Sequence, residues 1–100
     1  MTNTGILLAR LYAGDRITSE SARSCGVRNP IQRIYEIKQR GVPVLTIREG
    51  RHNVYQIDPA ALDKLKQDVD LFRAQGQAAF ADLPLMQYSR ARYLAQALDR

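Results

Sequence analysis

The chain has 100 residues, of which 45% are hydrophobic and 25% are charged, a composition that is ordinary for a globular protein and argues against disorder. At roughly 100 to 200 residues per domain, this length allows one core and excludes two large ones. The net charge of +5 favours a polyanionic partner.

The first part of the chain predicts helices separated by short turns. Apolar residues at helical spacing predict a helix over residues 4–13, closed by a Gly-Asp turn. Thr18 is expected to cap a short helix over residues 19–25. Gly26, just past that helix, can take the left-handed conformation that turns the chain.

The next predicted helix, over residues 30–40, has the most clearly marked ends. Asn29 is a preferred N-cap, a proline suits the first helical position, and Gln32 stands where a capping-box partner belongs. Gly41 is a stop signal, and the proline two residues later prevents continuation. We expect one stripe of this helix to face the core. That stripe comprises Ile31, Ile34, Tyr35 and Lys38, with Ile37 beside it.

The rest of the chain predicts a hairpin and two further helices. Alternating side chains predict strands over residues 44–49 and 53–57, joined by a short tip. An Asp-Pro pair then opens a helix over residues 59–75. A last helix is expected from residue 84 or 85 to residue 98. The predicted fold is therefore mainly α with a small β-hairpin, of the α+β class.

Basic charge is concentrated in the first part of the chain. Residues 1–58 carry about +4 and residues 59–100 about +1. An α-helix fits the major groove of DNA, where Gln pairs with adenine and Arg with guanine through two hydrogen bonds. Gln32 and Arg33 lie in the first turns of the 30–40 helix, where base contact is usual. We therefore expect these two side chains to contact bases.

Other polar side chains around the same helix are predicted to contact the DNA backbone. Those before and within the helix would lie near phosphates, and those of the hairpin tip near phosphates or the minor groove. The predicted DNA-binding residues are Arg28, Asn29, Gln32, Arg33, Glu36, Lys38, Gln39, Arg40, Arg48, Arg51, His52 and Asn53.

Several of these residues also have a purely structural interpretation. Arg33 and Glu36 are three residues apart and can form a solvated ion pair. Hairpin tips are commonly polar only because they are exposed. Tyr35 and Tyr55 are expected in the core and not as platforms for stacked bases.

Catalysis and metal binding find little support in the sequence. There is one histidine, His52, and one cysteine, Cys25, with no glycine-rich phosphate loop and no spaced carboxylate pair. We expect a protein that is not an enzyme and has no metal or cofactor, with Cys25 as a small core residue. With no cysteine pair and no signal-peptide core or membrane span near the start, we expect a cytoplasmic location.

Residues 33–44 resemble the third helix and first wing strand of small winged-helix proteins common in phages and prophages. Those proteins tend to carry an Arg-Ile-x-acidic-aliphatic-basic run that ends in Gly-x-Pro/Ile-aliphatic. Residues 54–57 are similar to their returning wing strand, and the resemblance covers residues 6–57. It implies a winged helix-turn-helix over residues 1–58, with the third helix in the major groove and the hairpin as the wing.

Residues 59–100 have no counterpart in that family. Their helices carry more apolar surface than a small domain covers, so we expect them to form a homodimer with two half-sites about 34–36 Å apart. The side chains behind this expectation are Leu85, Met86, Tyr88, Tyr93, Leu94 and Leu98.

The expected function is sequence-specific binding of double-stranded DNA, as a transcriptional regulator of phage, prophage or plasmid type. The alternative is a protein-interaction or assembly module that has a winged-helix fold and does not read bases. A nonspecific architectural DNA binder is a third interpretation, because phosphate contacts alone give affinity without specificity.

Overall fold

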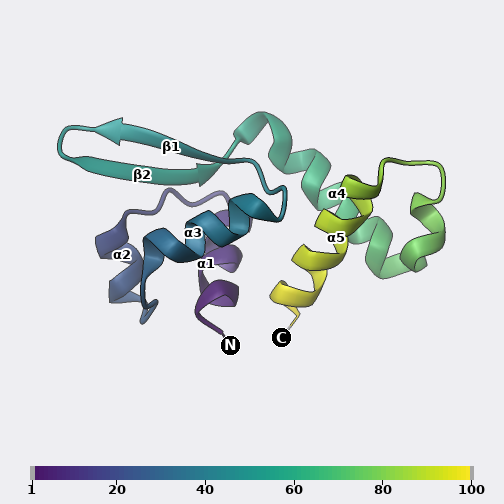
Figure 1. The fold of residues 1–100 in the computed structure, drawn as a ribbon, viewed down its shortest axis with the longest axis horizontal. Helices are drawn as coiled ribbons and strands as arrows, with labels where there is room; N and C mark the ends of the chain where they lie inside the picture. The colour runs from purple at the N-terminus through teal and green to yellow at the C-terminus, as the bar shows by residue number, and fades with distance from the viewer. Residues whose placement is uncertain (1, 100) are drawn as a thin grey trace.

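Helices dominate the computed structural model, which describes residues 2–99 (Figure 1). The predicted α+β class is confirmed, since a two-stranded antiparallel hairpin interrupts the series of helices. In chain order the elements are α1 (Asn3–Tyr12), α2 (Ser19–Ser24), α3 (Pro30–Gln39), β1 (Val44–Glu49), β2 (His52–Ile57), α4 (Pro59–Gln75), the 3₁₀ helix η1 (Gly76–Phe80) and α5 (Leu85–Leu98). Across residues 2–99, no helix is both long enough and apolar enough to cross a membrane.

The start of α2 follows the predicted capping pattern. The Thr18 side chain accepts a hydrogen bond from the Ser21 backbone N–H, and the Ser21 hydroxyl accepts one from the Thr18 backbone N–H, each at 3.0 Å. Two backbone donors at the end of the helix are thereby satisfied. The capping contacts therefore fix the start of α2 at Ser19, directly after the link from α1.

The start of α3 differs from the prediction. Asn29 has φ +51° and ψ +59°, a left-handed conformation, and its side chain makes no capping hydrogen bond. The turn from α2 into α3 requires a residue that tolerates positive φ, and Asn is one of the few that do. Asn29 therefore acts as a turn residue, while Pro30 begins the helix as predicted.

The core face of α3 is also displaced from the predicted stripe. Ile34 and Ile37 are buried as expected, but Ile31 is 60% and Tyr35 is 61% exposed. The buried positions are 30, 34 and 37, which follow one helical face at spacings of four and three residues. Assigning Ile31 and Tyr35 to the core was therefore wrong. The buried face of α3 is rotated away from the predicted stripe by about the angle between one residue and the next.

The hairpin is tighter than predicted. Val44 pairs with Ile57 and Glu49 pairs with His52, so His52 belongs to β2 and the turn consists of Gly50 and Arg51. The Ile17 N–H donates to the Tyr55 carbonyl at 2.8 Å, and the Tyr55 N–H donates to the Ile17 carbonyl at 2.7 Å. This bridge attaches the link between α1 and α2 to the edge of β2. Tyr55 is buried, as predicted.

One hydrophobic core joins the N-terminal helices to the C-terminal ones. Leu8 and Leu11 of α1 and Ile37 of α3 belong to the same buried cluster as Leu65 of α4 and Leu94 of α5. The expectation that Leu94 would face a partner was wrong, because α1 and α4 both pack against α5. Tyr88, Tyr93 and Leu98 are half-buried, whereas Leu85 and Met86 stay exposed.

Candidate nucleic-acid interface

The face of α3 that points away from the core is not covered by any described element. Gln32 and Gln39 are exposed, and helical spacing places both opposite the buried positions. Tyr35 lies beside them, and its hydroxyl accepts a hydrogen bond from Gln39 Nε2 at 3.0 Å. This face therefore presents two amide groups and an aromatic side chain along one helix.

Arg33 and Glu36 lie on the flank of this face. Arg33 Nη1 is 3.1 Å from Glu36 Oε2, so the ion pair that their spacing allows is formed. The Arg33 side chain is 29% exposed, and its buried Nε has no hydrogen-bond partner among residues 2–99. Arg33 is thus partly engaged within the protein, while Gln32 beside it is free to reach outward.

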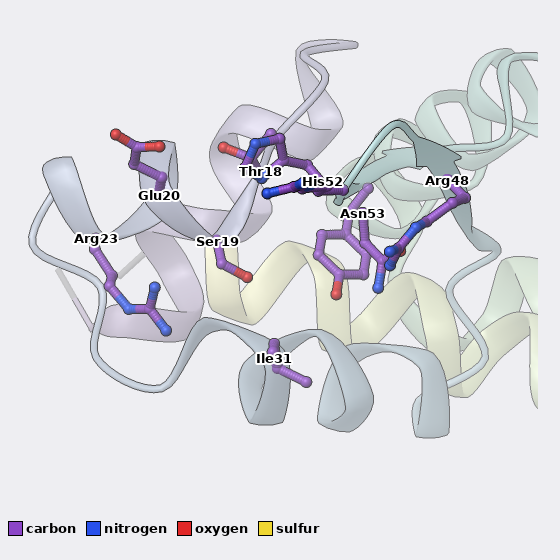
Figure 2. A pocket seen from close by; sticks show the side chains of 10 residues that line it. Thr18, Ser19, Glu20, Arg23, Ile31, Arg48, His52 and Asn53 are labelled. Atoms are coloured by element: carbon purple, nitrogen blue, oxygen red, sulfur yellow. The ribbon is translucent and has the colours of Figure 1, made fainter.

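A cleft of about 450 Å³ separates α2 and α3 from the hairpin. Figure 2 shows Arg23 of α2 on one side of it and Arg48 of the hairpin on the other, with Ile31 of α3 between them. Apart from Glu20, the charged residues that line this cleft are basic. Its lining residues are Thr18, Ser19, Glu20, Arg23, Ile31, Arg48, Arg51, His52, Asn53 and Tyr55.

The arginines around the cleft differ in how they are held. Arg48 Nε donates to the Gly50 carbonyl at 3.0 Å, and its Nη1 lies 3.5 Å from Asn53 Oδ1, which positions the guanidinium at the tip. Arg51 and Arg23 form no ion pair within residues 2–99 and are exposed. These three positive charges are therefore available to an anionic ligand.

Other basic residues link β1 of the hairpin to the preceding part of the chain. Lys38 Nζ donates to Thr46 Oγ1 at 2.8 Å, which links α3 to β1. Arg16 forms an ion pair with Glu49 at the end of β1. Both contacts help to hold the hairpin beside α3, and the first of them engages a lysine that was predicted to contact DNA.

A second depression, also of about 450 Å³, lies on the other side of α3, between its C-terminal end and α5. The Arg40 guanidinium is 5.2 Å from the centre of the Tyr93 ring, a distance typical of a cation–π contact. Burial raises the pKa of Tyr93, and the Arg40 charge partly offsets that rise. The phenol therefore stays protonated at neutral pH. The depression is lined by Arg40, Tyr88, Ser89, Arg92, Tyr93, Gln96 and Ala97.

Cys25 is half-buried at the end of α2, and its Sγ is 2.9 Å from Arg10 Nη1. It is thus less buried than the core position predicted for it. Within residues 2–99, no three His, Cys, Asp or Glu side chains gather in a way that could hold a metal ion.

The structure divides the predicted DNA-binding residues between several places. The four hairpin residues share one cleft, while Arg28 and Asn29 are exposed in the turn before α3. Sequence reasoning missed Arg23 and the exposed pair Ile31 and Tyr35. The four- and three-residue spacing of Pro30, Ile34 and Ile37 is the signal in the sequence that would have identified the buried face of α3. Comparisons of the chain with protein-family models, with curated proteins and with solved structures give no match.

Proposed function

We propose that this protein is cytoplasmic and binds double-stranded DNA in a sequence-specific manner through a winged helix-turn-helix. In this proposal α2 and α3 are the helix-turn-helix, α3 enters the major groove, and the β1–β2 hairpin is the wing on the flanking backbone or minor groove. The observation that carries the proposal is the uncovered face of α3, which has exposed Gln32 and Gln39 and lies beside a hairpin with a basic tip. No catalytic step and no cofactor form part of it.

Base contacts are assigned first to Gln32. The amide N–H of a glutamine can donate to adenine N7 while its oxygen accepts from the N6 amino group, and Gln32 extends from the first turn of α3 without a partner in the described chain. Ile31 and Tyr35 lie beside it and offer apolar surface to a thymine methyl group. Arg33 remains a candidate for guanine, but it would have to leave Glu36 to bind.

Phosphate contacts are assigned to the cleft arginines. Arg23, Arg48 and Arg51 surround a space open to solvent, and a DNA strand that passes between α3 and the wing would meet all three. Arg28 and Asn29 lie exposed in the turn between α2 and α3 of the same segment. The regulatory role, of phage, prophage or plasmid type, rests on the resemblance of residues 6–57 to that family.

Replacing Arg51 tests the phosphate contacts. Arg51→Gln should weaken binding to any duplex by a similar factor and should lower the slope of log affinity against log salt by about 1. Fluorescence anisotropy with a labelled duplex between 50 and 200 mM salt measures both quantities. Lys66→Gln is the matched control, since it removes one positive charge from α4 beside Tyr12 and outside the proposed interface. Equal slopes for the two variants would contradict a wing contact.

A homodimer remains part of the proposal. The apolar side chains left for such a contact are Leu83, Leu85 and Met86, which are 39%, 75% and 56% exposed around the start of α5. Light scattering at micromolar protein concentration should give twice the mass of one chain, and Leu85→Ser should reduce it. A wild-type protein that scatters as a monomer would contradict the dimer and leave the DNA interface unaffected.

One observation favours the second candidate function, a protein-interaction or assembly module. Ile31 and Tyr35 together expose apolar surface on the most open face of α3, and exposed aromatic side chains are frequent anchors at protein interfaces. In that case the wild-type protein would not bind duplex DNA at 50 mM salt, and Gln32 would be neutral.

A further inference from the structure

The arginines around α5 fall into two groups. Arg73 is bound by Asp99, with Nη2 and Oδ1 2.7 Å apart, and Arg90 faces the buried Asp68, with Nη2 and Oδ2 3.7 Å apart. Arg92 is exposed and forms no ion pair within the described residues. The helix α5 therefore leaves one of its own guanidinium groups without an ion pair, in the same depression as Arg40, the residue that follows α3.

Arg92 and Arg40 line the same depression, and no carboxylate lines it with them. Ser89 and Gln96 add a hydroxyl and an amide, which are further donors to phosphate oxygens. The Arg40 guanidinium lies over the Tyr93 ring, and this cation–π contact restricts the position of the long side chain. Two cations and two neutral donors thus come together from segments about fifty residues apart in the sequence.

The position of this depression relative to α3 is set by a buried network. Asp68 of α4 is 2% exposed, and it accepts a hydrogen bond from Gln87 Nε2 at 3.0 Å. Arg90, which faces Asp68, also donates to the Gly41 carbonyl at 3.4 Å, directly after α3. Because α4, α5 and the end of α3 meet in one polar cluster, Arg92 is carried at a fixed place beside α3.

We propose that α5 is a third DNA-contacting element, in which Arg92, together with Arg40, binds phosphates of the strand opposite the one that the hairpin meets. This inference rests on the proposed function, in which α3 lies in the major groove. The groove is about 12 Å wide and is bordered by a sugar-phosphate backbone on each side. Figure 1 shows α3 between the hairpin and α5, so each border of the groove has a protein element facing it. The protein therefore clamps the groove from both sides.

Salt-dependent anisotropy on Arg92→Gln tests the inference. One lost phosphate contact lowers the slope of log affinity against log salt by about 0.9. The ratio of wild-type to variant affinity should therefore fall about 3.5-fold between 50 and 200 mM salt. Arg92→Lys, which keeps the charge, should restore most of the slope, and Lys66→Gln should match the wild type. Since Arg92 is exposed, circular dichroism should show the same fold for each variant.

The outcomes separate this inference from the function on which it rests. If Arg51→Gln changes the slope and Arg92→Gln behaves like Lys66→Gln, the α5 contact is wrong and the winged-helix interface stands. If the wild-type protein binds no duplex at 50 mM salt, both are wrong. Phosphate ethylation interference adds a direct readout, in which wild-type protein should show blocked positions on both strands and Arg92→Gln should lose those on one strand only.

Discussion

Replacing Leu94 with alanine should lower the free energy of unfolding by about 2–5 kcal/mol, the range for removing a buried leucine side chain. Leu94 is fully buried in the cluster that also contains Leu8, Leu11 and Ile37. The cavity would therefore weaken α1 and α3 as well as α5. Urea unfolding followed by far-ultraviolet circular dichroism should show a single transition at lower denaturant concentration.

The matched control for this prediction is on the same helix. Leu85 is 75% exposed in the single chain, so Leu85→Ala should change the free energy of unfolding by no more than about 0.5 kcal/mol when it is measured below the concentration at which the chain dimerises. If Leu94→Ala instead splits the curve into two transitions, the C-terminal helices fold as a separate unit. That result would contradict a single core shared by α1, α3 and α5. It would instead indicate two folding units that divide between residues 58 and 59.

Gln32→Ala should have the largest effect on DNA recognition. A bidentate amide-to-adenine contact contributes about 1–3 kcal/mol of discrimination, so the preference for the best site over a mismatched one should fall about 5- to 150-fold. Because Gln32 is exposed, the free energy of unfolding should stay within about 0.5 kcal/mol of the wild type. Competition binding between matched and mismatched duplexes measures the preference.

Gln67→Ala is the control for this prediction, since it makes the same change at an exposed position of α4. It should leave both affinity and discrimination unchanged. An equal loss in the two variants would mean that Gln32 acts through stability or solubility. No loss in either would assign base reading to another part of α3 or to none.

Local chemistry was enough to predict most element boundaries. Pro30 and Gly41 mark α3, and the Asp58-Pro59 pair marks the start of α4, where the Asp58 side chain accepts a hydrogen bond from Ala60 N at 3.0 Å. These residues mark helix ends through their own backbone preferences, which do not depend on what packs next to them in the fold. Strand pairing was similarly readable from the alternation around the Gly50 turn.

The errors concern positions that depend on what packs next to them. Ile31 and Tyr35 have apolar character and helical spacing, but the turn at Asn29 rotates α3 so that positions 30, 34 and 37 face α1. Leu94 was assigned to a partner because the sequence does not reveal that α5 returns to α1. A single sequence contains the periodicity of a helix, but the contact that selects which side is covered is tertiary.

The candidate site was predicted in the same uneven way. The basic hairpin tip was found because its residues are consecutive, whereas Arg23 and Arg92 enter their depressions from other helices. Neither arginine has a distinguishing neighbour in the sequence. They become candidates because they line these depressions and form no ion pair within residues 2–99, whereas Arg73 and Arg90 are paired with carboxylates.

Selection of bound sequences from a random duplex library, with wild-type protein and Gln32→Ala in parallel, tests base reading by α3 most directly. A DNA-reading α3 predicts that the wild type enriches a short motif, repeated in a homodimer as two inverted half-sites about 34–36 Å apart. Gln32→Ala should lose preference at one position of each half-site and keep the rest. Failure of the wild type to enrich any motif, or enrichment of the same motif by Gln32→Ala with undiminished preference, would contradict the assignment.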